Sequence, residues 1–199
     1  MAAVRAMGKP HGLTTFGQYA DEFTRRMNLK LQLPVQRVDI SFDRYMAHSI
    51  KGGTRSKWST SLRKIRTKIA SRDTKLPSNW ASFIELDENK ADLANFLCEQ
   101  MMVCIELSEN QEFIISGGFE DPEKVVSLAG NDVKHLGSDH EEADTRILLQ
   151  AADAASCGVR RLVIHCRDTD VLLLLIVFAE HLSQEIWMKA GTSKKTSIH

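Results

Sequence analysis

The sequence predicts an α/β fold in which helices cover a mainly parallel sheet. The main observation is the stretch 138–182, where apolar residues at helical spacing are followed by a short β-branched run and a second helical segment. Two further apolar runs, at residues 38–42 and 113–115, have the length and composition of strands. Helices that lead into short buried strands are typical of parallel sheets, because parallel strands are joined by crossover connections.

The length and composition indicate one globular domain. With 199 residues the chain is long enough for a sizeable core, and residues 1–199 are expected to form a single domain. Its hydrophobic content of 43% and charged content of 26% are ordinary for a soluble protein, and the formal net charge is zero. The four cysteines show no CxxC spacing, which argues against a zinc site and favours an intracellular setting, nuclear or cytoplasmic.

No membrane partner is expected. The longest apolar run, residues 171–179, is shorter than the roughly 20 residues that a membrane-spanning helix needs. The N-terminus also lacks the continuous apolar core of a secretory signal.

The elements of the first half follow from local patterns. The segment 1–12 contains Gly and Pro residues and is expected to be a loop, and apolar residues at helical spacing predict a helix over 16–27. Alternating residues over 38–42 predict a strand, and the pattern of 88–101 predicts a helix.

The second half repeats the alternation of strand and helix. A short strand is predicted at 113–115, ending at a glycine pair, and another over 123–128. Ser138 and Glu141 have capping-box spacing, so a helix is expected to start there and to end at Gly158. Residues 162–164 then read as a buried strand, and 186–188 as the next strand.

Acidic residues gather where these elements begin and end. One follows the strand 38–42, two follow the strand 162–164, and two lie at the start of the helix between them. Ligands bind at the carboxyl ends of parallel strands. Carboxylates that converge there repel one another unless a cation compensates their charge, and hard oxygen ligands suit Mg²⁺ or Mn²⁺. The candidate metal-binding and catalytic residues are Asp43, Glu142, Asp144, Asp168 and Asp170.

A purely structural role explains the same acids. Glu142 and Asp144 then complement a helix dipole, Asp168 caps the following helix, and Asp43 starts a turn. Residues two apart on a regular helix do not share a face, so the spacing alone does not decide between the two interpretations.

The segment 49–75 is strongly basic. It holds nine Lys and Arg residues against one acid, Asp73, and apolar residues at helical spacing predict a helix over 62–69 within it. Such a strip attracts a polyanion by displacing its counterions, and Trp58 is suited to stack on a base. A solvated basic face with one packed Trp remains the alternative. The candidate nucleic-acid-binding residues are Lys51, Arg55, Lys57, Arg63, Lys64, Arg66 and Lys68.

The order of the acidic motifs carries a resemblance to a known superfamily. Glu142-Ala143-Asp144, then a helix, then residues 162–164 running into Asp168-Thr169-Asp170, resembles the internal region of flap-endonuclease-like nucleases of the PIN-like superfamily. Phe42-Asp43 resembles the end of another strand of that family. More closely, the chain resembles uncharacterised, multi-copy animal proteins that often lie beside mobile elements.

The resemblance implies a three-layer sandwich with a mainly parallel central sheet, in which the basic segment 49–75 is an insertion that grips nucleic acid. It implies a Mg²⁺- or Mn²⁺-dependent nuclease acting on DNA or RNA. The family pattern also contains a first strand ending in Asp, ahead of the stretch that matches residues 3–5, and a Gly-x-Asp element beyond the region of Lys194 and Lys195. The sequence starts after the first and stops before the second, so the fold is expected to be incomplete, trimmed at both ends, and its competence for cleavage stays open. The alternative is a non-catalytic nucleic-acid-binding or protein-interaction module that keeps the fold.

Overall fold

The computed structural model describes residues 1–32, 34–45, 65–121, 123–140, 143–192 and 195–198. The chain starts with helices α1 (Ala2–Met7) and α2 (Phe16–Asn28), the short turn η1 (Leu29–Leu31) and strand β1 (Arg37–Ser41). Helices α4 (Trp80–Phe83) and α5 (Asp87–Cys104) follow, and then strands β2 (Glu112–Ser116) and β3 (Val125–Ser127). The fold is therefore mixed α/β, as the sequence predicts.

The remaining elements continue the alternation. They are the turn η2 (Lys134–Leu136), helix α6 (Ala143–Ser156), strand β4 (Arg161–Ile164), helix α7 (Thr169–Val177) and the turn η3 (Ala179–His181). Strands β5 (Glu185–Thr192) and β6 (Lys195–Ile198) end the described part. No helix in that part is long and apolar enough to cross a membrane.

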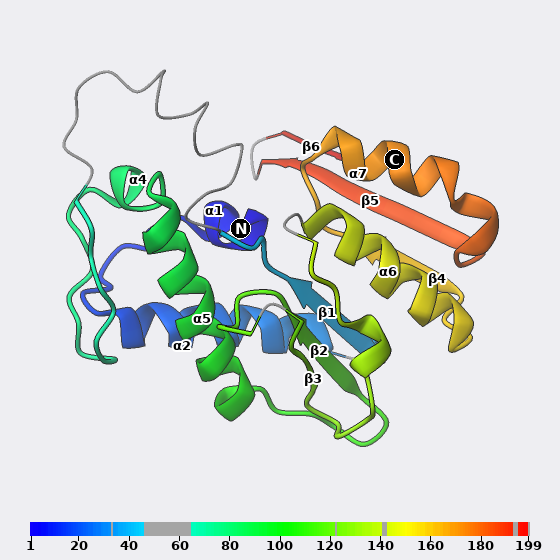
Figure 1. The fold of residues 1–199 in the computed structure, drawn as a ribbon, viewed down its shortest axis with the longest axis horizontal. Helices are drawn as coiled ribbons and strands as arrows, with labels where there is room; N and C mark the ends of the chain where they lie inside the picture. The colour runs from blue at the N-terminus through cyan, green and yellow to red at the C-terminus, as the bar shows by residue number, and fades with distance from the viewer. Residues whose placement is uncertain (33, 46–64, 122, 141–142, 193–194, 199) are drawn as a thin grey trace.

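The strands form two three-stranded sheets, β1-β2-β3 and β4-β5-β6, drawn as two groups of arrows in Figure 1. In each sheet one pair is parallel, β1 with β2 and β4 with β5, and the third strand is antiparallel. The sequence predicted one mainly parallel sheet with β1 and β4 as neighbours or nearly so. Parallel pairs are present, but each sheet has one parallel and one antiparallel pair. The single sheet is wrong among the described residues, because β1 and β4 each lie at the edge of a different sheet.

The first sheet is buried on both faces. Phe113 and Ile115 point into the main core with the apolar sides of α2 and α5, where Phe16 packs against Phe83 at 5.5 Å between ring centroids. Ile114 points the other way, to a small cluster with Leu136. This two-sided burial explains why β2 is a continuous apolar run rather than an alternating one.

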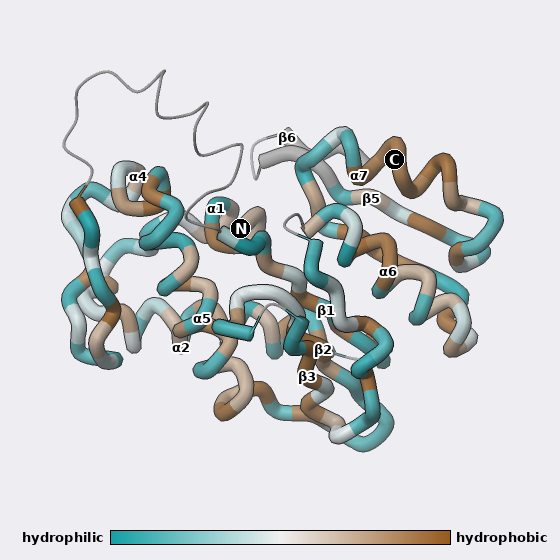
Figure 2. Tube along the Cα trace, in the orientation of Figure 1, coloured by the Kyte–Doolittle hydropathy of each residue, from teal (hydrophilic) through white to brown (hydrophobic). Residues whose placement is uncertain are grey.

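The second sheet is covered on one face. There, α6 and α7 pack onto β4 and β5 through Val171, Leu175 and Met188. On the opposite face Val163 is 55% exposed and Trp187 is 44% exposed. Figure 2 shows α7 as apolar along its length, and its outer side stays exposed.

Two local expectations are wrong. The first residues form helix α1 instead of a loop, because Val4 and Met7 are buried in the main core. Helix α6 begins at Ala143 and not at Ser138. The carbonyl of Ser138 accepts a hydrogen bond from Arg146 Nη2 at 2.9 Å, and its hydroxyl accepts one from His140 N at 3.2 Å. These bonds hold the segment outside the helix.

Gly117 lies where β2 passes beneath the end of β1. Its φ is +70°, and a Cβ added there would overlap the carbonyl oxygen of Phe42 and lie 2.7 Å from Arg146 Nη1. That guanidinium donates to the same carbonyl at 3.1 Å. Only Gly allows this close approach, which fixes the position of the segment that carries Asp43.

Gly117→Ala is therefore expected to lower the free energy of unfolding by about 3 kcal/mol, because backbone strain and steric overlap add. Gly130→Ala is the matched control, since Gly130 has φ +81° but no atom within 4 Å, and it should cost only about 1 kcal/mol. Urea denaturation of both variants measures the difference. Equal losses would show that the overlap is relieved without cost.

Candidate functional site

A large open cleft of about 1730 Å³ lies between β1 and β4. Both strands line it along their whole length, together with one side of α6 and parts of α1 and α2. Four of the five predicted acids are among its lining residues, Asp43, Asp144, Asp168 and Asp170. The fifth, Glu142, lies outside the described residues.

Helix α6 sets the direction of both strands. At its start the amide of Ala143 donates to Asp43 Oδ1 at 3.3 Å, just after β1. Near its end Asp153 forms an ion pair with Arg37 at 2.7 Å, at the beginning of β1. Strand β4 follows the end of α6, and Cys166, just beyond β4, is close enough to Asp144 at the start of α6 for that carboxylate to raise its pKa. Strands β1 and β4 therefore run in the same direction, and both are antiparallel to α6. Their carboxyl ends meet at the acidic end of the cleft.

Asp43 already has three hydrogen-bonding neighbours. Its carboxylate contacts the Met1 amino nitrogen at 3.3 Å and the Tyr45 hydroxyl at 3.0 Å, in addition to Ala143 N. Burial acts to raise the pKa of Asp43, but the Met1 ammonium and the hydrogen bonds outweigh it, so the pKa lies below its usual value. Asp43 is thus ionised and compensated by the protein itself.

Asp168 serves as the N-cap of α7. Its Oδ1 accepts a hydrogen bond from Asp170 N at 3.0 Å, which is the structural role that the sequence left as an alternative. Burial raises the pKa of the neighbouring Cys166 thiol, and the carboxylates of Asp144 and Asp168 add to the effect. The carboxylates of Asp144 and Asp168 therefore both influence the Cys166 thiol, which lines the cleft.

The acids share a cleft without forming a coordination group. Among the described residues, no group of three or more His, Cys, Asp or Glu side chains lies close enough together to hold a metal ion. Asp43 and Asp168 make the contacts given above. Joint binding of Mg²⁺ or Mn²⁺ by the described acids would thus require their side chains to move toward one another.

Five of the seven residues predicted to bind nucleic acid lie outside the described residues: Lys51, Arg55, Lys57, Arg63 and Lys64. Arg66 bonds to Asp92 at 2.7 Å and to Asn89 at 3.0 Å, so its guanidinium is tied to α5. Lys68 is exposed. The expected helix over 62–69 is absent from the described part, 65–69, which has no regular structure.

Sequence reasoning missed the residues that organise the other end of the cleft. Arg37 pairs with Asp39 at 2.8 Å as well as with Asp153. The three come from two elements far apart in the sequence, so only the folded chain brings them together. The signal available beforehand was Arg37-x-Asp39, because side chains two apart on a strand share a face.

The cleft also has a basic side that the sequence did not indicate. Partial desolvation, together with the ammonium groups of Lys30 and Lys189, lowers the pKa of His165 to about 4. Lys30 itself has a lowered pKa because of burial and Lys189. His165 is therefore neutral at pH 7, and the positive charge there comes from the two lysines.

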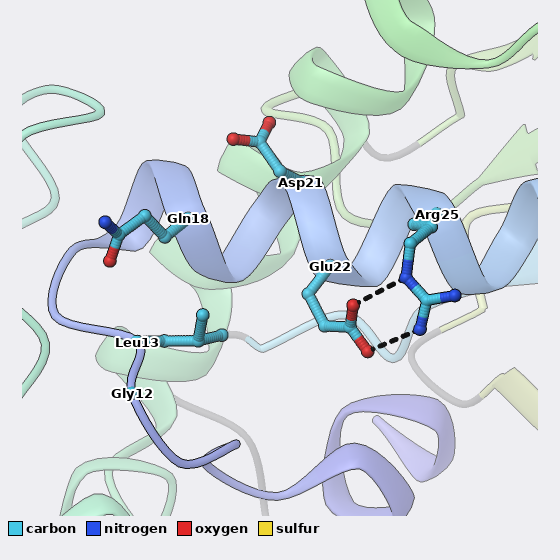
Figure 3. Close-up of a pocket in the computed structure, with 6 residues that line it drawn as sticks. All are labelled: Gly12, Leu13, Gln18, Asp21, Glu22 and Arg25. Carbon is cyan, nitrogen blue, oxygen red and sulfur yellow. Dashed lines mark hydrogen bonds and ion pairs between the residues drawn. The ribbon is translucent and has the colours of Figure 1, made fainter.

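A second, smaller hollow of about 360 Å³ lies beside α2 and is drawn in Figure 3. None of the predicted site residues lines it. Glu22 bonds to Arg25 and Arg26, each at 2.7 Å, and these bonds lower the pKa of Glu22 to about 2. Asp21 bonds to Arg72 at 2.6 Å. Its acids are neutralised by arginines, so this hollow is a weaker candidate site than the cleft.

Comparison with known proteins gave no match, whether with family models, with curated proteins or with solved structures.

Asp43→Asn is expected to lower the free energy of unfolding at pH 7 by about 1 kcal/mol, because it removes a partly exposed charge pair and weakens two hydrogen bonds. A carboxyl whose pKa is lower in the folded state stabilises the fold above its unfolded pKa and loses that contribution as the pH falls through its folded pKa. The difference between the two proteins should therefore shrink on acidification. Urea denaturation of both at pH 7 and pH 3 measures it, and a difference that grows at low pH would contradict this account.

Proposed function

We propose that this chain is a nuclease-type domain derived from a divalent-metal-dependent phosphodiesterase. The observation that carries the proposal is the placement of Asp43, Asp144, Asp168 and Asp170 along one cleft, although they span more than a hundred residues of sequence. Helix caps and dipole partners act singly, wherever a helix begins. A structural role alone therefore gives no reason for the four acids to share a cleft.

The acids are suited to hold Mg²⁺ or Mn²⁺ at the carboxyl ends of β1 and β4, with Glu142 as a further proposed ligand. A divalent cation bound there supplies charge stabilisation at a phosphodiester and an activated water. The contributions of the chain are separate from this. Asp168 holds the start of α7, and Lys30, which lines the cleft, adds positive charge there, which favours a polyanion.

We infer for the fold that the two sheets are halves of one PIN-like, three-layer arrangement. Two features support this: β1 and β4 run in the same direction, and α6 packs against both sheets. The basic segment 49–75 is proposed to grip the nucleic-acid backbone in this arrangement, as its charge indicates.

A second candidate is a non-catalytic nucleic-acid-binding or protein-interaction module. A specific observation favours it: the Asp43 carboxylate already accepts hydrogen bonds from the Tyr45 hydroxyl and the Ala143 amide. In this reading the acids position α6 and α7 and bind no cation.

Titration of Mn²⁺ separates the two candidates. The proposed site should release heat on binding, and Asp168→Asn should weaken binding at least about tenfold by removing a ligand charge. Asn is as good an N-cap as Asp, so the variant keeps helix α7. Glu120→Gln, at an exposed residue outside the cleft, is the control and should bind like the parent.

Cleavage of single-stranded and double-stranded DNA and RNA with and without Mn²⁺, by the same three proteins, then tests the enzyme. Metal-dependent cleavage that Asp168→Asn abolishes supports the nuclease. Equal heats from Asp168→Asn and the parent, or none from either, would leave the acids as caps and favour the module.

The basic strip is tested through salt dependence. Changing Arg63, Lys64, Arg66 and Lys68 to Ser should weaken nucleic-acid binding and flatten its salt dependence, by a slope of about 0.9 for each phosphate that is no longer neutralised. Because Arg66 is held by Asp92, Arg66→Ser alone should change the slope less than Lys68→Ser alone. Fluorescence anisotropy at several salt concentrations measures this, and an unchanged slope for the fourfold variant would mean a solvated face.

A further inference from the structure

The cleft between β1 and β4 is bounded by the open edges of two strands. Strand β1 is paired on one side with β2, and β4 is paired on one side with β5. On their other sides neither strand has a ladder partner among the described residues. An open edge carries a row of backbone N–H and C=O groups that need partners, and it is a template for another strand.

The pairing shows which backbone groups face the cleft. Glu112 N donates to Gln36 O, and Phe42 N donates to Ser116 O, so the even-numbered residues of β1 bond to β2. In a strand the N–H and C=O of successive residues alternate between the two sides. The groups of Arg37, Asp39 and Ser41 therefore face the cleft.

The same argument applies to β4. Glu185 N donates to Arg160 O, so the backbone groups of Arg160, Leu162 and Ile164 face β5. The backbone groups of Arg161, Val163 and His165 face the cleft. Because β1 and β4 run in the same direction, the two open edges match the two sides of one parallel strand placed between them.

The walls of the cleft define the side chains that such a strand would carry. On one side it is covered by the small and apolar face of α6, with Ile147, Ala151 and Ala154. On the other side Met1, Ala2 and Met27 line it, together with the charged residues Arg5 and Lys30. A parallel strand covered on both faces is apolar at nearly every position, and five residues match the length of β1.

We propose that this cleft binds an extended, apolar, β-branched strand of another polypeptide, which runs parallel to β1 and β4 and joins the two sheets into one. Backbone bonds to both edges supply the affinity, and the apolar walls select the side chains, as in recognition by strand addition. This activity goes beyond the proposed nuclease function and requires no metal.

The test uses an acetylated heptapeptide of five alternating Val and Ile residues followed by two Lys residues, added to the whole chain in the presence of EDTA. Saturable binding is expected by fluorescence anisotropy of a labelled form. Hydrogen exchange of the amides of Asp39, Ser41, Val163 and His165 should slow when the peptide is bound. The matched peptide has Pro at its third position, which removes a backbone donor, and it should bind more weakly.

A pair of variants tests the edge itself. Val163→Pro removes an N–H that faces the cleft and leaves the bonds to β5 in place, so it should weaken the peptide at least about fivefold, the effect of one net hydrogen bond. Val163→Ala keeps that N–H and should bind within about twofold of the parent, since the side chain is 55% exposed. Thermal unfolding checks that both variants are folded.

Three results would overturn the proposal. The first is absence of binding, or equal binding by both variants. The second is protection of the same amides by an oligonucleotide instead of the peptide, which would assign the cleft to nucleic acid. The third is protection that depends on protein concentration without peptide, which would assign it to a second copy of this chain. Because the experiment is run without metal, its failure leaves the proposed nuclease function untouched.

Discussion

The packing of α6 against two sheets that share no strand pair is the constraint on which the cleft depends. Toward the first sheet its contacts are polar, because Gln150 accepts from Ser41 Oγ at 2.7 Å and donates to Ser116 Oγ at 2.8 Å. Toward the second sheet they are apolar, through Ile147 and Leu148. Hydrogen bonds fix direction as well as distance, whereas apolar contacts are non-directional. The position of α6 is therefore defined mainly by the first sheet.

The same polar contacts bring the acids to one end of the cleft. Arg146 is 2% exposed and donates to the Phe42 carbonyl, and it lies one helical turn after Ala143, whose amide contacts Asp43. Burial lowers the pKa of the Arg146 guanidinium, and nearby Arg44 acts in the same direction, while Asp43 opposes them. A buried cation of this kind is tolerated only when its donors are satisfied. The hydrogen bonds that the buried Arg146 guanidinium requires thus also place the start of α6 beside Asp43.

The parts of the fold that the sequence predicted are those that local patterns determine. Val38 and Ile40 alternate with polar residues in β1, and the continuous apolar run around Ile114 reflects burial on two sides. Gly158, with φ +84°, ends the α6 segment as expected, since Val159 N donates to Ala154 O and Gly158 N to Ala155 O. These features need no information about distant residues.

The features that escaped prediction depend on distant partners. The capping-box spacing at Ser138 is a valid local signal, but a hydrogen bond from Arg146 takes the Ser138 carbonyl, so the helix starts later. The pattern of β4 gives a strand and says nothing about its neighbours, and the two sheets could therefore not be told from one. The acids were identified by residue type and by their order in the sequence. The partners of Asp43 were not identified: one is Met1, just before helix α1, and the other is Tyr45, two residues after Asp43.

What compensates the charge of Asp43 decides between a catalytic and a structural cleft. In the present arrangement the Tyr45 hydroxyl and the Ala143 amide donate hydrogen bonds to this carboxylate, and the cap of α7 occupies one oxygen of Asp168. A divalent cation must replace the first set of contacts before it gains those carboxylates. The free energy of cation binding is then the difference between the cation-bound state and a state in which the carboxylates already have partners. It is smaller than the attraction between a cation and carboxylates without partners. A strand that fills the cleft would exclude water from the same region, and electrostatic interactions strengthen as water is removed. For this reason we expect the binding of a strand in the cleft to be coupled to the charge compensation of Asp43 and Asp168.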